Sequence, residues 1–427
     1  MMRSHRARLA VFCVLSWTLI VLCQSSLPWV PATAFLMAAT IVHTAGMSIS
    51  ALYRTRRPQD AEQRQFPFVS IVIPAHNEAR VIAATVRNMM ELDYPDFEVL
   101  VADDRSTDGT GEEVAPLLNN WPGRLRLFRR PDSARPGKSA VLNDALKMCH
   151  GEVICVFDAE ARVAPDFLRR IVLLLNSPRT GAVQARKVYR NADSNTITRL
   201  LNAEYRLDAY FLEDRMRRGS GADMRGNGQV IRRRALEEIN GWNERTLTDD
   251  MDLSLRLHLA NWDIAFAADV PVTEEAVTTV HHLLRQRRRW VEGAVRSYLD
   301  YLPSLCARHM PLRKKMDTIV YSMGLVIPFW LVSDIIVQGI RMAAGCGQCT
   351  GAPFALFPVM VLFLTIHGVC ASRRFERMAW RDALATSFEC AVGMAVVWSA
   401  MVLYVVVRIL FLKERFVWAK TPHGVSR

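Results

Sequence analysis

Apolar residues gather at the two ends of the chain, and the long stretch between them contains no run of membrane-spanning length. At the N-terminal end, one apolar run covers 9–23 and a second covers 29–52. A helix needs about 20 apolar residues to cross a bilayer, so this pattern predicts a hairpin of two transmembrane helices within residues 1–52. Because the first run is short and follows a basic start, a signal peptide cleaved near 32–34 is the alternative.

Three more apolar runs lie near the C-terminus, at 318–340, 354–371 and 386–412. They predict a C-terminal transmembrane region of about three helices within 316–427. The arginines just after residue 52 place the next segment in the cytoplasm by the positive-inside rule. Three spans would then leave the tail outside, although 413–420 is basic, so one run is also compatible with an interfacial or re-entrant segment.

The segment 53–315 alternates short β-rich runs with helical patterns, which predicts βαβ units. The predicted strands cover 68–75, 97–104, 124–130 and 152–160. Such units build a mostly parallel sheet with helices on both faces, and ligands bind beyond the carboxyl ends of its strands. We therefore expect one large α/β domain with its site at that edge of the sheet.

The chain has 427 residues, a formal charge of +12 and a pI of about 9.5. A basic excess in a membrane protein is typical of cytoplasmic loops that face anionic headgroups, and no nucleic-acid recognition motif is present. The only closely spaced cysteines are Cys346 and Cys349. A single C-x-x-C is weak support for zinc, and we interpret it as an ordinary loop or a local disulfide.

Polar residues follow the first two predicted strands. Pro74, Asn77 and Glu78 open onto the expected crevice, where Asn77 could bind a base or a ribose, or instead cap a helix. Asp103 and Asp104 end the second strand. Two adjacent carboxylates are costly to bury without a partner, and a uracil N–H or a ribose hydroxyl would supply one.

Lys138 follows Gly137 at the start of a predicted helix, where a cation and free backbone N–H groups favour a phosphate. The P-loop spacing is absent, and the alternative is an ordinary exposed lysine. Asp158 and Glu160 lie two residues apart where the fourth strand ends. Carboxylates that converge there suit Mg²⁺ or Mn²⁺ together with a substrate's phosphates, although D-x-E alone is common.

Asp249 and Asp250 begin a helix predicted over 250–259. They could simply cap that helix. Alternatively, Asp250 is a general base that removes a proton from an attacking hydroxyl in a sugar transfer with inversion, whose transition state resembles an oxocarbenium ion.

Gln286, Arg289 and Trp290 share one face of a predicted helix, where they could clamp a diphosphate beside a sugar-stacking indole. Arg287 and Arg288 should point elsewhere. The same pattern also fits a basic helix lying on lipid headgroups.

Together these motifs resemble glycosyltransferase family 2 enzymes over residues 68–301. The resemblance implies an α/β GT-A fold, a Rossmann-like mixed sheet with helices on both faces, and transmembrane helices at both ends. It also implies that Asp103 and Asp104 contact uridine and that Asp158 and Glu160 form the D-x-D metal motif. The family usually has Asp where this chain has Glu160, which puts the metal preference in question.

The same resemblance makes Asp250 the base and matches Gln286, Arg289 and Trp290 to the Q-x-x-R-W motif of membrane-embedded members. Within the family, 241–259 and 285–294 are most similar to bacterial β-monoglucosyldiacylglycerol synthases. This implies UDP-glucose as donor, diacylglycerol as acceptor, and a multi-pass protein of the bacterial inner membrane with a cytoplasmic catalytic domain.

Two other functions are compatible with the sequence. Q-x-x-R-W also occurs in processive synthases of cellulose, hyaluronan and poly-N-acetylglucosamine, whose acceptor is the growing glycan. Asp334 and Glu389 are among the few polar residues in the apolar runs, which disfavours a glycan channel. A non-catalytic protein that binds nucleotide-sugars or anionic lipids is the third possibility, supported by Glu160.

Overall fold

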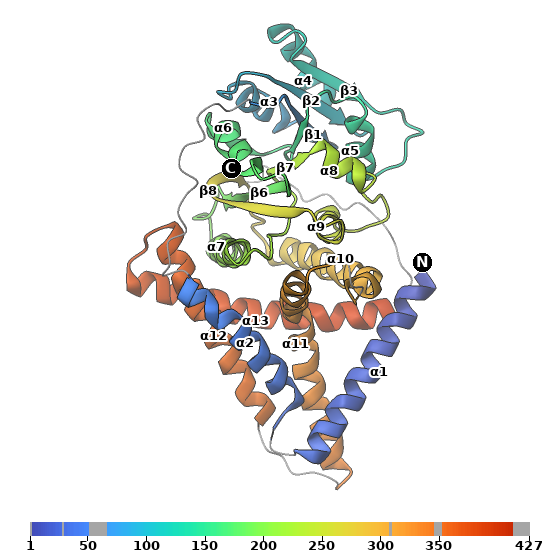
Figure 1. The fold of residues 1–427 in the computed structure, drawn as a ribbon, viewed down its shortest axis with the longest axis vertical. Helices are drawn as coiled ribbons and strands as arrows, with labels where there is room; N and C mark the ends of the chain where they lie inside the picture. The colour runs from blue at the N-terminus through green and yellow to red at the C-terminus, as the bar shows by residue number, and fades with distance from the viewer. Residues whose placement is uncertain (1, 28–29, 51–65, 307–309, 346–351, 413–427) are drawn as a thin grey trace. The chain divides into compact units, whose positions relative to one another are not determined.

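The computed structural model describes residues 2–27, 30–50, 66–306, 310–345 and 352–412 (Figure 1). The chain divides into two compact units. Of the described residues, the helical unit comprises 2–27, 30–50, 199–211, 279–306, 310–345 and 352–412, and the sheet unit comprises 66–198 and 212–278.

The sheet unit is built on one eight-stranded sheet with the order β3-β2-β1-β4-β7-β6-β8-β5. Pairs β1–β2, β2–β3, β1–β4 and β6–β8 are parallel, whereas β4–β7, β6–β7 and β5–β8 are antiparallel. The mixed α/β sheet that the family resemblance implied is therefore confirmed. The strands are β1 (Val69–Ala75), β2 (Phe97–Asp103), β3 (Leu125–Arg129), β4 (Val153–Val156), β5 (Arg162–Val163), β6 (Thr180–Tyr189), β7 (Gln229–Arg232) and β8 (Asp263–Glu274).

Short helices connect and cover these strands. They are α3 (Ile82–Met90), α4 (Thr110–Val114), α5 (Lys138–Leu146), α6 (Phe167–Val172), α8 (Arg233–Glu238), α9 (Asp249–Leu259) and the 3-10 turns Ala115–Asn120 and Leu173–Leu175. The longer α7 (Thr196–Arg217) contributes to both units, and Asn195 and Thr198 close a capping box at its start.

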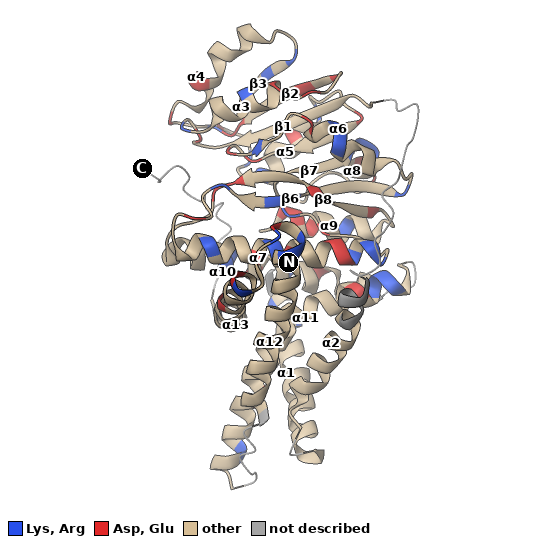
Figure 2. Ribbon diagram, turned by 90° about the vertical axis from the view of Figure 1, so that its left-hand side faces the viewer, with Lys and Arg blue, Asp and Glu red and all other residues tan. Residues whose placement is uncertain are grey.

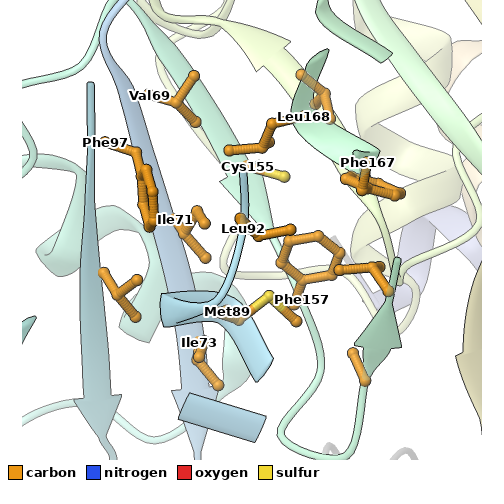
Figure 3. Packing of buried hydrophobic residues seen from close by; sticks show 14 of the residues in the cluster. Val69, Ile71, Ile73, Met89, Leu92, Phe97, Cys155, Phe157, Phe167 and Leu168 are labelled. Atoms are coloured by element: carbon orange, nitrogen blue, oxygen red, sulfur yellow. The ribbon is translucent and has the colours of Figure 1, made fainter. Parts of the chain in front are cut away.

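The core of the sheet unit follows from strands that are mostly apolar. All seven residues of β1 and of β2 are buried, as expected for parallel strands covered on both faces. Met89 of α3 packs with Ile71, Cys155 and Phe157 in this core (Figure 3). The ring centroids of Phe157 and Phe167 lie 5.3 Å apart.

One predicted strand end was wrong. The fourth strand was expected to continue to residue 160, but β4 ends at Val156. The backbone leaves the sheet because the N–H of Asp158 donates to Oδ1 of Asn227 at 3.2 Å and the N–H of Ala161 donates back to the carbonyl of Asp158. Asp158 and Glu160 therefore lie in a loop rather than on the strand.

The helical unit contains long apolar helices from both ends of the chain, as predicted. Four are long and apolar enough to cross a membrane, whereas the apolar part of the second helix, Ala32–Thr44, is shorter. These helices carry long stretches without charged residues (Figure 2). The helices of this unit are α1 (Met2–Ser26), α2 (Ala32–Ser50), α10 (Val280–Cys306), α11 (Leu312–Ala343), α12 (Ala352–Phe375) and α13 (Trp380–Phe411). Cys346 and Cys349 fall outside the described residues.

The carboxylate of Asp334 on α11 binds the beginning of α2. It accepts hydrogen bonds from the N–H of Ala32 at 3.3 Å and of Thr33 at 2.8 Å, and from the amide of Gln24 at 3.1 Å. It therefore caps the free N–H groups of an apolar helix from a neighbouring one. Residues 32–34, the alternative cleavage site, are thus part of a packed helix start.

α13 lies crosswise to α1, α11 and α12 in two perpendicular views (Figures 1 and 2). Gly368 of α12 meets Ser387 of α13 closely, since a Cβ on Gly368 would lie 2.8 Å from that of Ser387. Farther along, Val402 and Val405 of α13 pack with Leu9 of α1 in one cluster. Whether one C-terminal run is interfacial or re-entrant stays a prediction, because α13 is also long and apolar enough to cross a membrane.

Candidate active site

The loop after β1 is tied to the loop after β2. Asn77 has a left-handed backbone (φ +57°), and its side-chain Oδ1 accepts from the N–H of Thr107 at 2.8 Å. The N–H of Glu78 donates to Oγ1 of Thr110 at 2.8 Å, and Pro74 is part of β1 itself. Asn77 does not cap a helix, because α3 begins only at Ile82.

Asp104 is fully buried and already has protein partners. Its Oδ1 lies 2.6 Å from Nη1 of Arg130 and 2.9 Å from Nε of Arg105. Oδ1 of Asp103 accepts from the N–H of Ser106 at 3.1 Å. The premise that both carboxylates need a ligand to compensate their burial was therefore wrong for Asp104, because Arg130, the residue after β3, pairs with it. A uridine-binding role for this pair stays a prediction.

Lys138, the first residue of α5, joins two carboxylates of the predicted site. Its Nζ lies 2.7 Å from Oδ1 of Asp158 and 3.8 Å from Oδ2 of Asp249. Burial opposes the charged form, but Asp158, Asp249 and Asp250 outweigh it and raise the pKa of Lys138. Residues far apart in sequence thus form one charged cluster.

Asp250, on the first turn of α9, lies in this cluster. Burial and the charge of Asp249 raise the pKa of Asp250, while Met251, Arg225 and Lys138 oppose that rise. α9 begins one residue earlier than predicted, and Thr248 precedes it without a side-chain capping bond. Asp250 is half-buried, and a carboxylate with a raised pKa is typical of a general base.

Asp158 and Glu160 have different partners. Asp158 binds Lys138, whereas Glu160 is 4% exposed and its Oε1 lies 3.4 Å from the N–H of Glu275. Within the described residues, no three His, Cys, Asp or Glu side chains converge on a metal position. Mg²⁺ commonly takes one or two protein carboxylates and fills its other positions with phosphate and water, and the side chain of Asp158 is partly exposed. A metal-binding role for Asp158 and Glu160 stays a prediction.

The loop 219–228 was missed by the sequence analysis. Asn227 is fully buried, accepts from the N–H of Asp158 and donates to Oε2 of Glu274 at 3.0 Å. Gly226 has φ +87° and lies against Asp250, where an added Cβ would sit 3.4 Å from Oδ2. The many glycines in this loop could have revealed it in the sequence. Glycine readily adopts the left-handed backbone conformation that loops close to a site often need.

Gln286, Arg289 and Trp290 lie on α10, in the helical unit. The expectation for Arg287 was wrong, because it is 1% exposed and its guanidinium carbon lies 4.4 Å from the centroid of the Trp290 ring. Arg287 therefore belongs with Trp290. The sequence carried a signal for this pairing, because Arg287 and Trp290 are three residues apart on α10 and residues at that spacing share a helix face.

Comparisons with known proteins identify the class. A family model described as "Glycosyltransferase like family 2" matches residues 67–293. The mannosyltransferase PcManGT from Pyrobaculum calidifontis, solved in complex with GDP-Man and Mn²⁺, has the same fold, with a TM-score of 0.61 at 21% identity over 90% of this chain and 99% of that one.

The chain belongs to glycosyltransferase family 2. The β-monoglucosyldiacylglycerol synthase of Trichormus variabilis is 36% identical over 389 residues, which cover 90% of this chain and 82% of that protein. The Synechocystis sp. synthase is 35% identical over 383 residues, which cover 86% and 77%. This protein is thus a hexosyltransferase with apolar helices that associate with a membrane, and it is related to glycolipid synthases.

Proposed function

We propose that this protein transfers glucose from UDP-glucose, with inversion at the anomeric carbon, to the free hydroxyl of diacylglycerol. The observation that supports this most directly is the cluster of Lys138, Asp158, Asp249 and Asp250, which combines a cation suited to a phosphate with a half-buried carboxylate suited to proton transfer. The relationship to β-monoglucosyldiacylglycerol synthases favours glucose and a lipid acceptor.

In this mechanism Asp250 accepts the proton of the acceptor hydroxyl. The hydroxyl oxygen then forms a bond to the anomeric carbon while the bond from that carbon to the diphosphate breaks on the opposite face. Burial suits Asp250 to this role, because a carboxylate with a raised pKa is a stronger base. Asp249 keeps that pKa raised by its adjacent negative charge.

The leaving UDP carries the negative charge that develops in the transfer. Lys138 can turn from Asp158 to the diphosphate, because its four-carbon side chain is flexible. A divalent cation, Mg²⁺ or Mn²⁺, would be held by Asp158, with Glu160 as a candidate second ligand, and would neutralise the diphosphate. Pro74, Asn77, Glu78, Asp103 and Asp104 are the proposed contacts for the nucleoside.

Gln286, Arg289 and Trp290 are the proposed acceptor and diphosphate contacts on α10. A water-soluble donor and a membrane-dissolved lipid meet only at the membrane surface, which explains why a domain with this site (residues 53–315) lies between apolar helices. The basic residues after residue 52 favour the cytoplasmic face of the bacterial inner membrane.

The test is transfer by the purified protein in diacylglycerol-containing micelles with labelled UDP-glucose and Mg²⁺. A single labelled monoglucosyl lipid in the organic phase is the expected product, and Asp250→Asn should yield none. Parallel reactions with UDP-galactose and UDP-N-acetylglucosamine test the sugar. Label in a polymer outside the lipid fraction would replace this proposal with a processive polysaccharide synthase.

A further inference from the structure

A buried arginine lies between two indole rings in the helical unit. The guanidinium carbon of Arg287 on α10 is 4.4 Å from the ring centroid of Trp290 and 5.6 Å from that of Trp398 on α13. Arg287 is 1% exposed, so both cation–π contacts are shielded from water and are stronger than exposed ones.

Glu204 on α7 completes this cluster. Its Oε2 lies 2.6 Å from Nη2 of Arg287, and its Oε1 accepts from Nε1–H of Trp398 at 3.3 Å. Burial raises the pKa of Glu204, and the guanidinium of Arg287 counters that rise. The carboxylate therefore fixes both the guanidinium and the second indole, so that neither can rotate freely.

We infer that Arg287, held by Glu204 and Trp398, is a positioning residue that orients the indole of Trp290 for the acceptor. The inference rests on the proposed acceptor role of Trp290 and adds residues from α7 and α13 to it. A stacking indole loses affinity if its plane turns, and Arg287 covers its ring. Lysine cannot replace this contact, because its ammonium lacks the planar fork that stacks on a ring while it binds a carboxylate.

The experiment measures transfer by the full-length protein with acceptor and UDP-glucose varied separately. In Arg287→Lys we expect kcat/KM for the acceptor to fall by about 10- to 100-fold, the cost of a misplaced contact, with UDP affinity unchanged. Arg288→Lys is the matched control, because Arg288 is the next residue on α10 and has no part in the cluster; it should behave as the wild type.

A second variant separates positioning from folding. Arg287→Met alone would leave the largely enclosed carboxylate of Glu204 without its ion-pair partner, whereas Arg287→Met combined with Glu204→Gln removes both charges and should keep the protein folded. We expect this double variant to melt near the wild-type temperature and still to use the acceptor poorly.

Three results would overturn the inference. These are wild-type acceptor kinetics in Arg287→Lys, equal losses toward donor and acceptor, or recovery of acceptor use in the double variant. If the wild-type enzyme transfers glucose to a glycan instead, the proposed acceptor is wrong, and the same comparison with that glycan still tests Arg287. If the wild type transfers sugar to no acceptor, the proposed function fails. That outcome is distinct from the three above, in which the wild type is active.

Discussion

The ammonium group of Lys138 lies 2.7 Å from Oδ1 of Asp158, and the same nitrogen is 3.8 Å from Oδ2 of Asp249. In the sequence these residues belong to three separate motifs, predicted for phosphate, metal and proton transfer. The fold brings them together because α5, the loop after β4 and the start of α9 meet there. A lysine that links the proposed metal anchor to Asp249, the neighbour of the proposed base, can respond to a bound diphosphate.

Substitution of Lys138 by Met should therefore weaken transfer. One charge-assisted hydrogen bond contributes about 1.5–3 kcal/mol, which corresponds to a loss of about 10- to 100-fold in kcat/KM for UDP-glucose. Steady-state kinetics with varied UDP-glucose measures this, and Lys147→Met, an exposed lysine just past α5, is the control. An unchanged KM and kcat would exclude Lys138 from donor binding.

The raised pKa of Asp250 should set the pH dependence of transfer. The base must be deprotonated, so activity falls as the pH drops through its pKa. Because burial and Asp249 raise that pKa, the acidic limb should lie above the ordinary value of about 3.9. Asp249→Asn removes the adjacent charge and should move the limb to lower pH, whereas Glu237→Gln, exposed on α8, should leave it in place.

Loss of the base itself should be far more severe. Asp250→Asn should reduce kcat by about 10²- to 10⁴-fold while UDP still binds, which calorimetry can measure. Turnover at the wild-type rate in this variant would mean that another group removes the proton.

Much of the fold could be predicted from hydrophobic patterning, because β1 and β2 are mostly apolar runs and the terminal apolar helices are long. The end of β4 could not be predicted in this way, since Asn227, which lies far along the chain, draws the backbone of Asp158 out of the sheet. The partners of Asp104 could not be predicted from the sequence either, because Arg130 reaches Asp104 only when β2 and β3 pair. Contacts of this kind depend on tertiary structure rather than on local pattern.

The two predicted metal ligands, Asp158 and Glu160, should differ in how much each contributes to metal affinity. Asp158→Asn should raise the Mg²⁺ concentration for half-maximal activity by about 10-fold or more, as expected when a ligand is lost. Glu160→Gln should raise it less, because Glu160 lies against the N–H of Glu275. Metal titrations of both variants distinguish the two, and equal effects would show that Glu160 turns to the metal when the donor binds.

Asn227 should matter for stability as well as for the site. Asn227→Ala removes a fully buried side chain that bonds the backbone of Asp158 and the carboxylate of Glu274. Leaving buried polar groups unsatisfied costs about 1–3 kcal/mol, so the melting temperature in detergent should fall. Asn119→Ala, exposed in the turn after α4, is the control and should melt like the wild type. Equal melting temperatures for the two variants would contradict this role.

The end of α13 predicts the side of the membrane on which the chain continues. The side chain of Arg6, near the start of α1, donates to the carbonyl of Leu412, so the two helix ends lie together. If α1 and α2 form a hairpin that returns to a cytoplasmic domain, the start of α1 is cytoplasmic, and Leu412 is cytoplasmic with it. A crosswise α13 meets this requirement, whereas a third C-terminal span does not.

Cysteine labelling of vesicles tests this topology in a variant whose own cysteines are replaced. Leu412→Cys should react with a membrane-impermeant maleimide only in inside-out vesicles. Ser26→Cys, at the opposite end of α1, should react only in right-side-out vesicles. Because the basic residues after α13 favour the cytoplasm, this result would also reconcile the charge of the tail with the number of apolar helices. Labelling of both cysteines only in right-side-out vesicles would instead mean that α13 crosses the membrane.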